Sequence, residues 1–247
     1  MPIVRTDPRS PVAVGDYFTS LKGTRIMEYE LVRSRRKTAV LHIDPAGRLM
    51  VKAPLHMPLY VIEGFIEEKR DWIEKTAARM QAAQENRRAR LGEKPSELPL
   101  WGEMVPVVHT PPYGYADGAF SLPEDMTLGE ALPYINRLYR SIAKRVLIPR
   151  TWELAEKYGF SVSDVKISSA ETRWGSCSGK KSINLSWKLA FAAPHLADYV
   201  IIHELCHTRF MDHSPRFWAE VGKYIPDHRQ CREGLKETQR ILEKYGI

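Results

Sequence analysis

This sequence has few cysteines, and it lacks both long apolar runs and an apolar N-terminal segment. Its three cysteines, Cys177, Cys206 and Cys231, are too few and too irregularly spaced for the disulfide framework of a small secreted protein. No run approaches the roughly eighteen apolar residues of a transmembrane helix. The first twenty residues carry prolines and charges where a signal peptide would need an apolar segment. We therefore expect a cytoplasmic protein that does not span a membrane.

A glycine-rich phosphate loop, an internal repeat and a low-complexity tract are also missing. The 247 residues are 43% hydrophobic and 27% charged, as in ordinary globular proteins. The net charge is +7, and residues 137–188 hold eleven Lys or Arg against four Asp or Glu. This excess favours either a solvated basic face or a surface that attracts phosphates or acidic chains.

Changes in hydrophobic periodicity predict an α+β chain in three parts. Residues 1–23 show no periodicity, so we expect a flexible N-terminal tail. Residues 24–125 combine strand-like alternation over 29–53, helical spacing over 59–90 and short apolar runs separated by proline and glycine. These patterns predict an N-terminal antiparallel β-region, beginning with a β-meander, that contains one long helix. A domain boundary is expected near Asp125.

Residues 126–247 are predicted to form the catalytic domain. Thr127 and Glu130 make a capping box that starts a helix, Pro149 is expected to kink or split it, and Gly159 to end it. Three short apolar runs between residues 165 and 187 then predict a small antiparallel sheet, and the chain after Pro194 is predicted to be helical.

The first predicted helix after Pro194 carries a motif with metal-ligand spacing. His203 and His207 are four residues apart, so both side chains lie on one face of the helix, about one turn from each other. Zinc favours imidazole nitrogen, and a catalytic site needs three protein ligands and one open position. His213 follows where the helix should end, and it is the predicted third ligand. Glu204 is then the expected general base toward metal-activated water.

Several neighbouring residues have alternative roles. Cys206 is expected to pack inward as a small hydrophobic residue rather than to bind the metal. His228 supplies either a proton or an oxyanion contact, or it is structural. The second nitrogen of a ligand imidazole needs a partner, and the candidates are Asp198, Asp212, Glu220 and Asp227.

Three runs of this sequence carry a resemblance to a known family: Arg173-Trp174-Gly175-Ser176-Cys177-Ser178, Ile183-Asn184-Leu185-Ser186-Trp187, and the histidine motif followed by His213-Ser214-Pro215-Arg216-Phe217-Trp218. Together they resemble the YgjP-like family of predicted metal-dependent hydrolases, which is grouped with zincin-like metallopeptidases and is similar to WLM and SprT-like proteases. The resemblance extends from about Leu31 to Leu242. It implies three histidine ligands, a catalytic glutamate, a zincin-like catalytic domain and a bacterial cytoplasmic origin.

Candidate substrate-binding residues lie on the strands before the metal motif. The run 182–187 places Ser182, Asn184 and Ser186 on one face, and as an edge strand beside the metal helix it would pair with an extended peptide. An ordinary surface strand is the alternative. Arg173 and Trp174 are either an anion clamp with a stacking surface or a packed tryptophan beside an exposed arginine.

These features predict a metal-dependent hydrolase of the metallopeptidase type. The expected cofactor is Zn²⁺, with Ni²⁺, Co²⁺ or Fe²⁺ as alternatives, and the expected substrate is a peptide or protein. The first alternative is hydrolysis of nucleoside triphosphates, favoured by Arg173, Lys180 and Lys181. The second is a nucleic-acid-associated protease, favoured by the pI of about 9.3. No obligate partner is predicted.

Overall fold

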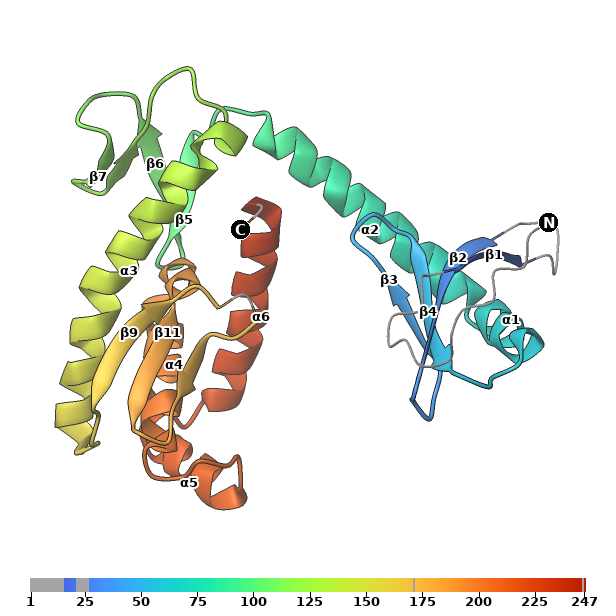
Figure 1. Cartoon of the computed structure of the whole chain (residues 1–247). Helices are drawn as coiled ribbons and strands as arrows, with labels where there is room; N and C mark the ends of the chain where they lie inside the picture. Colours follow the sequence, from blue (N-terminus) through green and yellow to red (C-terminus); the bar gives the residue numbers. More distant parts are fainter. Residues whose placement is uncertain (1–15, 21–26, 171, 246) are drawn as a thin grey trace. The chain divides into compact units, whose positions relative to one another are not determined.

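The computed structural model describes residues 16–20, 27–170, 172–245 and 247 (Figure 1). These residues fall into two compact units, which divide between Asn86 and Arg87. The α+β class is confirmed: three small sheets combine with six α-helices in the described residues. The tail expected at 1–23 lies mostly outside the described residues, although residues 16–20 of it form a strand.

The first unit is a four-stranded sheet followed by helices. Its strands, in the order β1-β2-β4-β3, are β1 (Asp16–Ser20), β2 (Met27–Ser34), β3 (Val40–Ile43) and β4 (Leu49–Pro54). The predicted antiparallel meander is wrong here, because β2 and β4 pair in parallel. The β3–β4 turn has Gly47 at φ 81°, where other residues are strained. The Asp44 carboxylate accepts hydrogen bonds from the N–H groups of Ala46 and Arg48 in the same turn.

The long helix expected over residues 59–90 is two helices, α1 (Leu59–Glu68) and α2 (Arg70–Leu91), which are separated at Lys69. Ile62 and Ile66 of α1 pack with Val51 of β4 in the core of the first unit. By contrast, residues 81–90 of α2 are almost all exposed. The division between the two compact units falls in this exposed part of the helix.

The second unit begins with a four-stranded sheet in the order β5-β6-β8-β7, made of β5 (Glu97–Leu100), β6 (Glu103–Val108), β7 (Gly114–Ala116) and β8 (Ala119–Ser121). A domain boundary near Asp125 would place this sheet with the N-terminal part. In the structure it packs with the C-terminal part, because Leu98, Leu100 and Phe120 are buried in the same core as the helices that follow.

Helix α3 (Leu128–Tyr158) crosses the second unit without a break (Figure 1). It starts at the predicted capping box of Thr127 and Glu130, and it ends at Gly159, which has φ 64°. Pro149 does not split it, although proline inside a helix costs about 3 kcal/mol. The buried side chains of Leu147 and Leu154 hold both halves of the helix on the core and offset that cost.

The second sheet of this unit is mixed rather than antiparallel. Its strands β9 (Asp164–Ser168), β10 (Gly175–Cys177) and β11 (Ser182–Ser186) lie in the order β10-β11-β9, with β11 parallel to β9 and antiparallel to β10. The strand over residues 182–186 is therefore central, and the edge strand beside the metal helix is β10. Strand β9, which follows α3 along the chain and packs against it, pairs with the side of β11 that β10 leaves open.

A 3₁₀ turn, η1 (Trp187–Phe191), leads into three helices: α4 (Pro194–His207), α5 (Pro215–Tyr224) and α6 (His228–Tyr245). Most side chains of α4 are buried on every face, since the helix packs against β10, β11, α3, α5 and α6. The motif-bearing helix is thus the central element of the second unit. Among the described residues, no helix combines the length and apolar character that crossing a bilayer requires.

Candidate metal centre

The structure brings the three predicted ligand histidines together. His203 and His207 lie one turn apart on α4, and their Nε2 atoms are 3.2 Å from each other. His213 lies in the turn between α4 and α5, with its Nε2 atom also 3.2 Å from that of His203. In a tetrahedral zinc site with Zn–N bonds of 2.0–2.1 Å, two ligand nitrogens are about 3.3 Å apart. The three imidazoles therefore fit one small divalent ion.

Aromatic rings fix the orientation of these imidazoles. Phe217 of α5 is fully buried and contacts all three, with ring centroids 4.4 Å from His207 and 4.9 Å from both His203 and His213. Trp218 stacks on His213 at 5.7 Å and on His228 at 5.3 Å. Phe217 is not among the site residues that the sequence predicts. One feature of the sequence points to its role: Phe217 lies four residues after His213, within α5.

The second ring nitrogens have different partners from those expected. The Nδ1 atom of His207 lies 2.9 Å from the carbonyl oxygen of Phe210, which can only accept a hydrogen bond. Nδ1 therefore carries the proton, and Nε2 is left as the lone-pair donor that a metal needs. The Nδ1 atom of His203 is buried without a hydrogen-bond partner among the described residues.

The four carboxylates considered for this role lie elsewhere. Asp198 forms an ion pair with Arg150 of α3, and Asp212 accepts a hydrogen bond from the Ser214 backbone. Glu220 pairs with Arg209 and Lys223, and among the described residues no ligand histidine donates a hydrogen bond to the Asp227 carboxylate. The backbone carbonyl of Phe210 supplies the contact instead, which a sequence pattern does not reveal.

Burial favours the neutral form of two of the ligand imidazoles, those of His203 and His207. It lowers the pKa of His203 to about 3, and the neighbouring His207 and His213 act in the same direction. Burial also lowers the pKa of His207, partly opposed by the hydrogen bond to Phe210. Neutral imidazole is the form that binds a metal ion. The lowered pKa values of His203 and His207 thus agree with the geometry of the cluster.

Glu204 is buried, with 5% of its surface exposed, and its side chain lies against the backbone of Gly175 on β10. Burial raises the pKa of this carboxyl to about 8, and Arg173 acts to lower it. Glu204 therefore occupies the space between the metal-bearing helix and the edge strand. Cys206, as expected, is fully buried in the core and lies outside the histidine cluster.

A cavity of about 880 Å³ opens beside His203 and Glu204. Among the candidate substrate residues, Arg173, Trp174 and Ser186 line it, whereas Asn184 does not. Ser186 is itself buried, and its hydroxyl accepts a hydrogen bond from the N–H of Lys188. Lys180 and Lys181 lie in the β10–β11 turn, outside the described lining of the cavity. The opposite wall is one face of α6, from Arg232 to Glu243.

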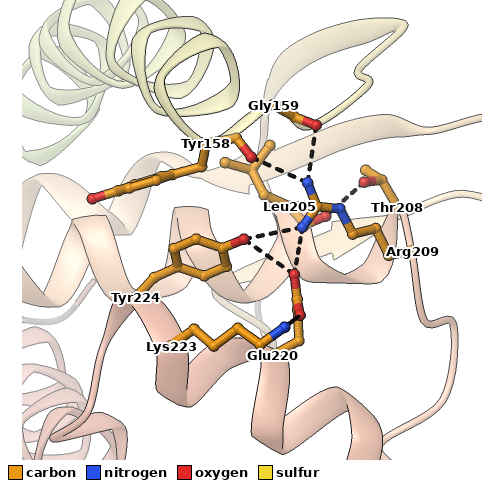
Figure 2. Close-up of polar contacts among 8 residues, drawn as sticks. All are labelled: Tyr158, Gly159, Leu205, Thr208, Arg209, Glu220, Lys223 and Tyr224. Atoms are coloured by element: carbon orange, nitrogen blue, oxygen red, sulfur yellow. Dashed lines mark hydrogen bonds and ion pairs between the residues drawn. The ribbon is translucent and has the colours of Figure 1, made fainter.

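Arg209 links the end of the metal-bearing helix to α3 and α5 (Figure 2). It donates to the carboxylate of Glu220 and to Tyr224, and its other terminal nitrogen donates to the carbonyl oxygens of Tyr158 and Gly159 at 3.1 and 2.9 Å. These are carbonyls at the C-terminal end of α3, which lack helical partners. Because Arg209 lies between His207 and His213, this network fixes the turn that positions both ligands.

Comparison with known proteins identifies the family of this chain. A family model described as YgjP-like, metallopeptidase domain, matches residues 37–238, and no curated protein matches the chain. One solved structure, the crystal structure of the metallopeptidase zymogen of Pyrococcus abyssi abylysin, is 26% identical over 40% of this chain and 90% of its own, with a TM-score of 0.31. Because the family model covers well over half of the sequence, the chain belongs to the YgjP-like metallopeptidase family.

Proposed function

We propose that this protein is a zinc-dependent peptidase of the cytoplasm in which Glu204 is the general base. The family supports a metal-dependent hydrolase of the peptidase type. The observation that carries the finer proposal is the convergence of three imidazole nitrogens, together with a cavity that both His203 and the buried Glu204 line. The proposal assigns metal binding to His203, His207 and His213.

The donor set favours zinc among the divalent ions. Three neutral imidazoles without a carboxylate suit zinc, and they also suit Ni²⁺, Co²⁺ and Fe²⁺, whereas magnesium and calcium prefer oxygen ligands. When bound, zinc polarises a substrate carbonyl and makes water a stronger nucleophile near neutral pH. The protein supplies the remaining chemistry.

Glu204 performs the proton transfers in this proposal. Its carboxylate accepts a proton from the attacking water and later donates it to the leaving amine of the cleaved peptide bond. Its position after His203 on α4 keeps it close to the histidines, and the packing of Gly175 against its side chain keeps it beside the edge strand. In this arrangement the Glu204 carboxylate lies between the metal-binding histidines of α4 and a substrate bound along β10.

Strand β10 is the part of the sheet suited to bind an extended peptide. Hydrogen bonds from Ser186 N–H to the Trp174 carbonyl and from Ser178 N–H to the Ser182 carbonyl show which groups face β11. By the alternation of an antiparallel ladder, the backbone N–H and C=O groups of Gly175 and Cys177 face away from β11. A substrate strand added there would pass beside Glu204.

Nucleoside triphosphate hydrolysis is a second candidate, supported by Arg173 in the cavity wall. Its support is weaker than the sequence suggested, since Lys180 and Lys181 lie in a turn away from the described lining. Nucleic-acid association gains no support from the family match. Peptide cleavage thus remains the leading proposal.

Two assays on one zinc-loaded preparation separate the candidates. Cleavage of a mixed peptide library is followed by mass spectrometry, and release of phosphate or pyrophosphate from nucleoside triphosphates is followed in parallel. We expect peptide cleavage that is lost on chelation and restored by adding zinc. Triphosphate turnover without cleavage of any library peptide would contradict the peptidase proposal.

A further inference from the structure

The cavity beside the metal centre has a long wall formed by α6. The residues Arg232, Leu235, Lys236, Gln239, Arg240 and Glu243 line it, at the spacing of one helix face. We call this wall, with Arg173 and Trp174 opposite, the α6 groove. From Arg232 to Glu243 the helix rises by about 16 Å, at about 1.5 Å per residue. An extended chain rises about 3.3 Å per residue, so the groove accommodates about five substrate residues.

The groove is rich in positive charge. Arg232, Lys236 and Arg240 follow one another at four-residue intervals on the α6 wall, whereas Glu243 is the only carboxylate that lines this wall within the described residues. Arg173 adds a guanidinium from the opposite side, next to Glu204. Both walls of the groove are therefore cationic near the metal centre.

The arginines nearest the reaction centre are available to a ligand. Among the described residues, neither Arg173 nor Arg232 forms an ion pair with a carboxylate, and Arg232 lies over the ring of Trp218 with its guanidinium carbon 5.6 Å from the centroid. Lys236 and Arg240 pair with Glu233 and Glu237 at the helix surface. These pairs are more than half exposed, and such pairs exchange partners at little cost.

The spacing of the cations matches an extended peptide. Residues four apart on a helix are separated by about 6 Å along its axis. Alternate residues of an extended strand are about 6.6 Å apart and point to the same side. Side chains at alternate positions of a bound peptide would consequently face successive cations of α6.

Resting on the peptidase function proposed above, we propose that the α6 groove selects peptides that carry carboxylates close to the scissile bond, and that Arg173 and Arg232 bind those carboxylates. The carboxylates come either from Glu and Asp side chains or from the free C-terminus of the peptide. Guanidinium groups suit both sources, because they bind carboxylates with two parallel hydrogen bonds.

Binding is measured separately from cleavage. The zinc-loaded Glu204→Gln variant of the full chain is titrated against fluorescent peptides by anisotropy, so that the probe stays intact. The probes are a peptide of alternating Glu and Ala with both ends blocked, the same peptide with Gln in place of Glu, and each peptide with a free C-terminal carboxylate. Arg173→Gln and Arg232→Gln are added to this background. Arg229→Gln, an exposed arginine of α6 outside the described lining of the cavity, is the matched control.

We expect the Glu peptide to bind about tenfold more tightly than the Gln peptide at low salt, with the difference reduced by Arg173→Gln or Arg232→Gln and by added salt. The Arg229→Gln control should bind as its parent does. A preference seen only for free C-termini would support the proposal and identify the terminal carboxylate as the source. Equal binding of all four probes would overturn it, and so would loss of preference in the Arg229→Gln control alone.

The outcome also separates this inference from the proposed function. If acidic peptides bind as expected but the wild-type protein cleaves none of them, the peptidase function fails while the preference of the groove stands. If the wild-type protein cleaves Glu and Gln peptides equally well and binds them equally, the function stands and the preference is overturned. Tighter binding of a nucleoside triphosphate than of any peptide would also overturn it.

Discussion

Gly175 lies so close to Glu204 that a methyl group at its α-carbon would be 2.7 Å from Glu204 Cγ and Oε1. Real side-chain contacts are not this short, so Gly175→Ala must displace the glutamate. We expect this variant to fold and to bind metal as the wild type does, but to lose at least about tenfold in peptide turnover, because a misplaced base transfers protons poorly. Gly179→Ala is the control, since a methyl group there meets no atom within 4 Å. Equal loss in both variants would contradict this explanation.

Replacement of the ligand histidines should lower metal content. His203→Ala, His207→Ala and His213→Ala each remove one of three converging nitrogens, and we expect each variant to hold well below one zinc per chain. His195→Ala, an exposed histidine on the same helix, should keep full occupancy. Elemental analysis of the purified variants decides this. Full occupancy in His213→Ala would remove that residue from the site and point to His228 or a carboxylate instead.

Arg209→Gln should destabilise the second unit. The change removes a charged hydrogen bond to Glu220 and leaves the carbonyls of Tyr158 and Gly159 without their donor (Figure 2). We expect a loss of about 1–3 kcal/mol in the free energy of unfolding, measured by urea titration. Arg229→Gln should change it by less than about 0.5 kcal/mol. A wild-type unfolding midpoint in Arg209→Gln would show that the network does not stabilise the turn.

The stability that Glu220 provides should depend on pH. The hydrogen bond from Lys223, together with Arg209 and Tyr224, lowers the pKa of this carboxyl below its ordinary value. The native state therefore binds fewer protons than the unfolded chain, whose glutamates titrate near about 4.3. The contribution is fully present above that value and is lost as pH falls through the lower native pKa.

Comparison of wild type with Glu220→Gln tests this pH dependence. The difference in their free energies of unfolding should be constant between about pH 6 and 7 and should shrink below about pH 4. A difference that grows on acidification would contradict the assigned pKa direction.

Local patterns in the sequence predicted much of what surrounds the metal centre. The capping box at Thr127, the end of α3 at Gly159 and the helical placement of His203 and His207 all follow from interactions within a few residues, and the structure confirms them. The order of the strands in the β10-β11-β9 sheet could not be predicted from such local patterns. Whether β11 is central or at an edge depends on whether β9 pairs along its second side, a contact between distant residues that alternation in the strand itself does not encode.

Long-range packing also explains the other differences between the sequence-based predictions and the structure. Pro149 remains inside a helix because buried residues on both sides hold it on the core. The partner of His207 Nδ1 is a backbone carbonyl, which any residue at position 210 could supply. Two of the four acidic residues that the sequence offered for this role, Asp198 and Glu220, instead form ion pairs with arginines and a lysine of α3, α5 and the turn after α4.

The most direct test of the proposed mechanism compares wild type with Glu204→Gln at equal, measured zinc content. The amide keeps the size of the side chain but cannot accept the proton of the attacking water. We expect an unchanged unfolding midpoint and unchanged metal content, with peptide turnover reduced by about 10²–10⁴-fold. Wild-type turnover in the metal-replete Glu204→Gln protein would contradict it.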